Sequence, residues 1–373
     1  MKLTIDTDKL SDAAQWVLRA VPSNPPTPVM AGMRLEAADS TLTLAGFDYY
    51  RSARAAEDCE VSEPGTLLVP GRVLADIVKT LPKGKPTTLA LDGTDLALSC
   101  GTAHILLPTL ALDDYPTLPT IPAASGTVDG ATLAEAGAAV APAASTDETL
   151  AILTGVQFAL SDTTMVLSAT DRYAFHVADV PWTPNPAVKG RGKNKPRIKG
   201  SAIVPADVVR DAARILADAD KAELTITDSQ FAISVPGRWA TGSLLDGELP
   251  KYVFPTEFES VATTGTEALT DAIKHIQPLL GKADPIVLEV ADDQITVRAG
   301  TDDKGRGRDQ VDASLEGEPL SIAFNPGLLL KALQQVSGPV TQINFTTSTK
   351  PALLHGVDQA DVFRGLVMPV RLS

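Results

Sequence analysis

The sequence is poor in cysteine and histidine, the residues that form disulfides and most often bind structural metal ions. Its 373 residues include only two cysteines and four histidines. Cys59 and Cys100 are too few for a disulfide scaffold or a multi-cysteine metal site. The histidines are scattered without the spacing of metal ligands. We therefore expect buried, reduced thiols and structural or surface histidines. Nothing implies a metal or cofactor.

Positive charge is also scarce. The chain has 32 Lys and Arg against 46 Asp and Glu, which gives a net charge of −14. Binding to phosphate chains is driven by Lys and Arg, which release counterions, so the net charge argues against general surface attraction to nucleic acid. A locally basic surface on an acidic body remains compatible with this balance.

Long apolar runs and short catalytic motifs are missing too. The N-terminal segment lacks the basic and apolar regions of a signal peptide, and no run approaches the roughly 20 apolar residues of a membrane span. We expect a soluble, cytoplasmic protein with no membrane partner. No G-x-S-x-G elbow or phosphate-binding loop occurs, and no nucleophile–base pair is apparent. The sequence therefore predicts a non-enzymatic protein.

What the sequence does contain is a repeat. Residues 33–48, 156–171 and 286–302 each read as an alternating strand, a turn, a second strand and a loop containing Asp. Residues 67–101, 202–237 and 321–356 each read as a strand, a turn, an amphipathic helix and two more strands. Both patterns recur with a period of roughly 125 residues and in the same order. The chain is therefore predicted to be three copies of one domain.

Each copy is predicted to hold two helices and roughly eight strands. Helices are expected over residues 10–19, 131–141 and 267–276, and after Pro70, Pro205 and Asn325. The helix after Pro70 is expected to bury one stripe made of Val73, Leu74, Ile77, Val78 and Leu81. The fold class is α+β, with helices packed on antiparallel sheets. Proline-rich connectors divide the chain into domains over residues 1–122, 123–255 and 256–373.

Two features of the loops and helices could carry function. Asp48, Asp171 and Asp302 occupy equivalent places in the repeats, so turn formation is a better interpretation than carboxylate chemistry. Residues 189–199 are dense in Lys and Arg and broken by Gly and Pro, which predicts a mobile basic loop between two strands of the second copy. This loop either contacts a polyanion or is a surface insertion. The cations on the helices are open to the same two interpretations.

Several short segments resemble one family. Residues 367–372, Val-Met-Pro-Val-Arg-Leu, are similar to a terminal Met-Pro-x-Arg-Leu motif, and residues 170–173 resemble a Thr-Asp-x-x segment. Residues 153–155 and 345–354 match as well. Together with the three copies, they make the chain resemble the bacterial β sliding clamp, the processivity subunit of DNA polymerase III, in its high-GC Gram-positive form. The resemblance covers the whole chain.

The resemblance implies a head-to-tail homodimer, a six-domain ring that encircles double-stranded DNA independently of sequence. Sparse helix cations would give the weak phosphate contacts that sliding needs. A groove would bind peptides of the DNA polymerase III alpha subunit, the clamp loader, and other polymerases and repair proteins. Carried over to this sequence, the groove comprises Leu153, Thr170, Arg172, Tyr173, Phe175, Pro250, Leu328, Thr349, Pro351, Val367, Met368, Pro369, Val370 and Arg371.

Two further sets follow from the same resemblance. The DNA-facing residues are expected to be Arg72, Lys79, Lys193, Lys195, Arg197, Arg210, Arg214, Lys274 and Lys331. The dimer interface is expected to join the strand around residues 104–107 to a helix end in domain three, through Ile105, Leu107, Leu279 and Leu280.

The sequence departs from the family pattern at four places. Ala174 stands where the family usually has Arg, Asn24 replaces a common Arg, residues 250–255 are short, and the basic insertion is unusual. We therefore hypothesise a specialised copy, borne by a phage or plasmid or present as a second chromosomal clamp, with changed partner or inhibitor binding. The alternatives are a three-repeat scaffold that does not bind DNA and, less favoured, a hydrolase within this fold.

Overall fold

The computed structural model describes residues 1–25, 27–188, 195–281, 284–301, 305–357, 359 and 362–371. The chain forms two compact units. The first unit consists of residues 1–130, 184–198 and 214–244. The second consists of residues 131–183, 199–213 and 245–373. Each unit is described by itself below.

The α-helices come in pairs, one pair in each predicted repeat. They are α1 (Thr7–Val17), α2 (Gly71–Thr80), α3 (Gly130–Val140), α4 (Ala206–Leu216), α5 (Thr266–Ile276) and α6 (Pro326–Leu333). The prediction of two helices per copy is thus confirmed for the described residues. The stripe predicted for α2 is wrong in part, because Val73 is 47% exposed and Ile77 is half-buried. Leu74, Val78 and Leu81 are buried as predicted, and Gly71 and Ala75 complete the buried face of the helix.

The first unit contains two antiparallel sheets. The smaller has the order β5-β1-β7-β8-β9, with β1 (Lys2–Asp6), β5 (Glu60–Glu63), β7 (Pro86–Asp92), β8 (Asp95–Cys100) and β9 (Ala103–Pro108). The larger has the order β6-β2-β3-β4-β17-β16-β15-β10. Its strands are β2 (Gly32–Ala38), β3 (Thr41–Phe47), β4 (Arg51–Asp58), β6 (Gly65–Pro70), β10 (Gly126–Val128), β15 (Ala222–Ile226), β16 (Gln230–Val235) and β17 (Arg238–Ser243).

The second unit is built in the same way. One sheet has the order β14-β11-β12-β13-β25-β24-β23-β18-β21, and a second has the order β22-β19-β20-β21. The strands are β11 (Gly155–Leu160), β12 (Thr164–Thr170), β13 (Ala174–Pro184), β14 (Gly200–Pro205), β18 (Ser260–Gly265), β19 (Ile286–Val290), β20 (Gln294–Thr301), β21 (Gly305–Gly317), β22 (Leu320–Phe324), β23 (Val340–Phe345), β24 (Ala352–Gly356) and β25 (Phe363–Val367).

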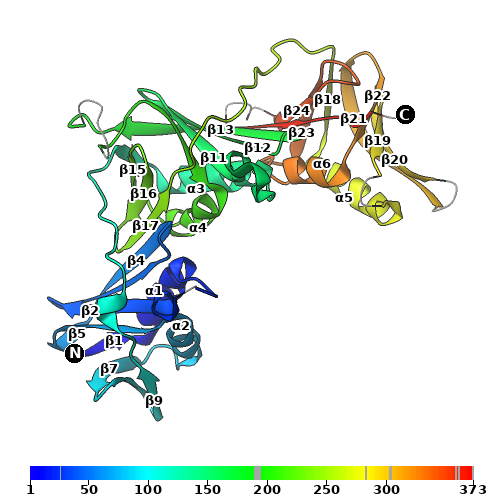
Figure 1. Ribbon diagram of the computed structural model, residues 1–373. Coiled ribbons are helices and arrows are strands. Elements are labelled where there is room, and N and C mark those ends of the chain that lie inside the picture. Colours follow the sequence, from blue (N-terminus) through cyan, green and yellow to red (C-terminus); the bar gives the residue numbers. More distant parts are fainter. Residues whose placement is uncertain are drawn as a thin grey trace. The chain divides into compact units, whose positions relative to one another are not determined.

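The two units divide the chain differently from the three predicted repeats. Strand β17 of the second repeat pairs with β4 of the first (Figure 1), and β13 of the second repeat pairs with β25 of the third. Each half of the second repeat therefore belongs to a sheet that it shares with a neighbouring repeat. The domain boundaries at residues 122 and 255 stay predictions.

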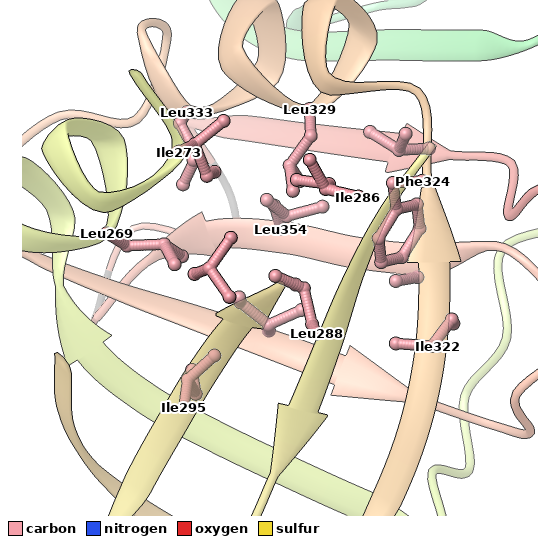
Figure 2. Close-up of a cluster of buried hydrophobic side chains, with 14 of the residues drawn as sticks. Leu269, Ile273, Ile286, Leu288, Ile295, Ile322, Phe324, Leu329, Leu333 and Leu354 are labelled. Atoms are coloured by element: carbon pink, nitrogen blue, oxygen red, sulfur yellow. The ribbon is translucent and has the colours of Figure 1, made fainter. Parts of the chain in front are cut away.

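The core of the third repeat lies between its helices and sheets. Leu269 and Ile273 of α5 and Leu329 and Leu333 of α6 are fully or almost fully buried. Figure 2 shows these side chains directed toward Ile286 and other apolar residues of the strands beneath them. Helix α6 begins where Asn325 accepts hydrogen bonds from the backbone N–H groups of residues 327 and 328, a standard N-cap.

Candidate functional site

Two adjoining apolar pockets lie in the second unit. The first has a volume of about 190 Å³ and is lined by Thr170, Arg172, Tyr173, Ala174, Phe175, Pro250, Lys251, Tyr252, Pro351, Leu366 and Met368. The second has a volume of about 510 Å³ and is lined by Tyr173, Asn325, Gly327, Leu328, Lys331, Met368, Pro369 and Val370. Tyr173 and Met368 line both pockets, so we call the two together the groove. An apolar groove of this kind suits an extended peptide with apolar anchor residues.

A tight turn before β13 presents Tyr173 to the groove. The Asp171 carboxylate accepts hydrogen bonds from the backbone N–H groups of Tyr173 (2.9 Å) and Ala174 (2.8 Å). The Thr170 hydroxyl donates to the Ala174 carbonyl (2.6 Å) and accepts from the Arg172 N–H (3.0 Å). Arg172 takes a left-handed conformation with φ of 83°. These bonds hold the backbone, while the Tyr173 side chain stays 58% exposed.

The C-terminal segment supplies the opposite side of the groove. Strand β25 pairs with β13, and just beyond it the Met368 N–H donates to the Tyr173 carbonyl (2.8 Å). The Val370 N–H donates to the Ala323 carbonyl (2.8 Å), and Pro369 forms a bridge to Phe324. The segment is therefore held at both ends while the Met368 side chain remains 40% exposed.

The first repeat carries the same turn. The Asp48 carboxylate accepts from the N–H groups of Tyr50 (3.0 Å) and Arg51 (2.7 Å), and Tyr49 has φ of 72°. The Tyr50 carbonyl accepts from the Ser243 N–H (2.7 Å), as that of Tyr173 does from Met368. Turn formation by Asp48 and Asp171 is thus confirmed, and Asp302 lies outside the described residues.

Most of the predicted groove residues meet in the two pockets. These are Thr170, Arg172, Tyr173, Phe175, Pro250, Leu328, Pro351, Met368, Pro369 and Val370. Four others do not line them. Leu153 packs in a small core with Ile203 and Leu249, and Val367 belongs to the core of the third repeat. Thr349 and Arg371 are exposed outside the lining.

The prediction also missed part of the lining. Lys251 and Tyr252 come from the segment that the sequence presented as a connector, and Leu366 comes from β25. Lys331, expected to face DNA, lines the second pocket together with Asn325 and Gly327. Among the described residues, the lining holds the cations Arg172, Lys251 and Lys331 and no carboxylate. Burial raises the pKa of the Tyr252 phenol, so it stays neutral.

Three family models match the chain in order. They describe the N-terminal, central and C-terminal domains of the DNA polymerase III beta subunit, and they match residues 1–119, 127–251 and 251–371. The chain belongs to the beta sliding clamp family. Its α+β fold of three tandem clamp domains, expected from the repeats, is confirmed by these matches together with the observed helices and antiparallel sheets.

Individual clamps resemble the chain over its full length. The beta sliding clamp of Streptomyces coelicolor is 40% identical over 385 residues, covering 100% of both chains. The beta sliding clamp homolog GriR of Streptomyces muensis is 35% identical over 380 residues, covering 100% of this chain and 99% of GriR. The fold matches that of the Pseudomonas aeruginosa sliding clamp bound to griselimycin, with a TM-score of 0.90, 23% identity and full coverage of both chains.

The cations expected to face DNA in this clamp are exposed on their helices. This holds for Arg72, Lys79, Arg210, Arg214, Lys274 and Lys331. In the basic segment, Lys195 is exposed and Lys193 lies outside the described residues. Arg197 is half-buried, donates to the Thr227 carbonyl (2.9 Å) and forms an ion pair with Asp228 (3.6 Å). Residues 195–199 form no helix or strand, as predicted.

The residues expected at the dimer interface differ in exposure. Leu279 and Leu280 are half-buried at the end of α5. On the edge strand β9, Ile105 is half-buried, but Leu107 is 4% exposed and already packs within its own unit. Leu106 between them is 50% exposed, because side chains alternate across a strand. Leu106 therefore offers more apolar surface to a partner than Leu107 does.

No helix in the described part of the chain is long and apolar enough to span a membrane. No cluster of three or more His, Cys, Asp or Glu residues in that part could hold a metal ion.

Proposed function

We propose that two copies of this chain close head to tail into a ring around duplex DNA, and that the groove tethers partner proteins to that ring. The partners are the DNA polymerase III alpha subunit, the clamp loader, and other polymerases and repair proteins that carry a clamp-binding peptide. In this function the protein catalyses no reaction. It raises the local concentration of a bound polymerase at its template.

The observation that carries this proposal is the groove itself. Its two apolar pockets share Tyr173 and Met368, whose backbones are fixed and whose side chains are exposed. Exposed apolar side chains on a rigid frame are typical of a site for a linear peptide. A scaffold that does not bind DNA could carry such a groove, so the decisive test concerns DNA.

The chain should be retained on circular DNA and lost from linear DNA. A closed ring cannot leave a circle, whereas weak phosphate contacts on a chain of net charge −14 dissociate quickly in salt. The chain is loaded onto a nicked plasmid with a clamp loader and ATP, separated by gel filtration in about 200 mM salt, and then cut with a restriction enzyme. Most bound chain should leave after linearisation. Equal retention on both forms would contradict encirclement and favour the scaffold.

We further propose that this clamp is a specialised copy with a changed groove. Ala174 is 3% exposed and lines the first pocket, where the family usually places an Arg. A ligand that accepts a hydrogen bond from that Arg in another clamp has no charged donor at this position in this chain. The full-length likeness to the homolog GriR, at 35% identity, fits this proposal.

Griselimycin provides the test, because it occurs bound to another sliding clamp. A lost hydrogen bond to a charged group is worth about 1.5–3 kcal/mol, so this chain should bind griselimycin roughly tenfold or more weakly than the Streptomyces coelicolor clamp does. The variant Ala174→Arg should recover much of the difference. Calorimetric titration measures the affinity of this chain, of Ala174→Arg and of the Streptomyces coelicolor clamp for griselimycin. Equal affinity in all three would contradict a retuned groove.

A further inference from the structure

Residues 251–255, which we call the strap, belong to no helix or strand, and the first two of them, Lys251 and Tyr252, form part of the wall of the first pocket. Tyr252 and Phe254 pack on Phe175 of β13, with ring centroids 5.8 Å and 5.9 Å away, and on each other at 5.8 Å. Val253 between them is 88% exposed. The strap is therefore extended, with one face on the sheet and the other in solvent.

Arg364 of β25 holds the far end of this aromatic cluster. Its guanidinium carbon lies 5.4 Å from the centre of the Phe254 ring, a cation–π distance. The same guanidinium donates to the Asp179 carboxylate of β13 at 2.9 Å. The side chains of Arg364 and Asp179 are 27% and 29% exposed, so this pair is partly shielded from solvent.

The strand register places Arg364 on the same side of the sheet as the pocket. Phe175 lies opposite Leu366, and both line the first pocket. Arg364 precedes Leu366 by two positions and therefore points to the same face. The strap follows this face from the pocket, at Tyr252, to Arg364, at Phe254. Arg364 itself does not line the pocket.

We propose that Arg364, seated between Asp179 and Phe254, is a positioning residue that fixes the strap as a wall of the first pocket and so sets the selectivity of that pocket for its apolar anchor. This inference rests on the proposed peptide binding. Two aromatic contacts on an exposed strap leave it able to move, and a mobile wall must be ordered each time an anchor binds, which lowers affinity. The Arg364 contacts supply that order in advance.

The first experiment separates the two anchors of one peptide. A labelled peptide of the Gln-Leu-x-Leu-Phe type and two versions with one apolar anchor changed to alanine are titrated by fluorescence anisotropy. The variant Leu328→Ala shows which anchor binds in which pocket. Leu328 lines only the second pocket, so this variant should weaken the contribution of the second-pocket anchor alone. In the unmodified chain, loss of the first-pocket anchor should cost about tenfold in affinity.

The variant Arg364→Met should reduce that cost to about twofold and leave the cost of the other anchor unchanged. Arg364→Lys should restore the larger cost, because it keeps a cation beside Asp179 and Phe254. Arg298→Met is the matched control, since Arg298 is also a strand arginine paired with a carboxylate, Glu289, but lines neither pocket of the groove. If Arg364→Met left the affinity cost of losing each anchor unchanged, the inference would be overturned.

A second experiment measures the mobility of the strap in the absence of peptide. Trypsin cleaves after Lys251, and the rate of that cut, followed by mass spectrometry, rises when the strap is mobile. Arg364→Met should raise it about fivefold, and Arg298→Met should not. An unchanged rate would overturn the inference alone. A chain that bound none of the peptides would overturn the proposed function and this inference together.

Discussion

Replacing Tyr173 and Met368 together by alanine should weaken binding of a clamp-binding peptide about 100-fold, which corresponds to about 3 kcal/mol. Both side chains line both pockets, so their loss removes the shared wall on which each anchor packs. The hydrogen bond between the Met368 N–H and the Tyr173 carbonyl involves the backbone and survives the change. Anisotropy titration with the labelled peptide measures the loss.

The first repeat offers a matched control for that double variant. Tyr50 occupies the same turn, is 77% exposed, and accepts the same backbone hydrogen bond, here from Ser243. Tyr50→Ala should leave peptide affinity unchanged. The melting temperatures of both variants should stay close to that of the unmodified chain, because they lose exposed side chains only. A loss of less than about threefold in the double variant would place the peptide elsewhere.

The repeat could be predicted because it rests on local signals. Alternating strands and amphipathic helices depend on neighbouring residues, and the same signals recur in each copy. The partner of each strand is not a local property. Nothing in β17 or β13 indicates that one pairs with β4 and the other with β25. The sharing of sheets between repeats therefore became visible only in the structure.

The groove was predictable where it rests on sequence motifs and unpredictable where it rests on packing. The turn at Asp171 and the segment ending at Met368 carry motifs, and both line the groove. Tyr252 lies in a proline-rich stretch with no periodic pattern. Its packing on Phe175 could therefore not be predicted from the sequence. Lys331 looked like any exposed helix cation, and only the position of α6 brings it to the second pocket.

His176 presents a different case, because its sequence position predicted no more than a structural or surface role. It is fully buried on β13, its Nδ1 lies 2.8 Å from the Ala139 carbonyl, and its ring packs edge-on against Phe363. Nδ1 therefore carries the proton and donates, while the buried Nε2 has no hydrogen-bond partner among the described residues. A proton added at Nε2 would be a buried charge without an acceptor.

Stability should accordingly fall as the pH drops from 6.5 to about 4. Burial chiefly lowers the pKa of His176 from 6.5 to about 4, with Lys331 acting in the same direction and the Ala139 carbonyl and Asp171 opposing it. Between these two values the unfolded chain binds a proton that the folded chain does not, so protonation favours unfolding. At 1.36 kcal/mol for each pKa unit, the full loss is about 3 kcal/mol.

Urea unfolding of the chain and of His176→Asn, measured between pH 7 and pH 4, isolates this contribution from that of the carboxylates. Asparagine keeps a donor near the position of Nδ1 for the Ala139 carbonyl but does not titrate. The variant will start from a lower stability because it leaves a cavity, yet its stability should fall less steeply below pH 6.5. The difference between the two curves should shrink by about 3 kcal/mol over this range. Parallel curves would show that the folded chain admits a proton at His176 as readily as the unfolded chain does.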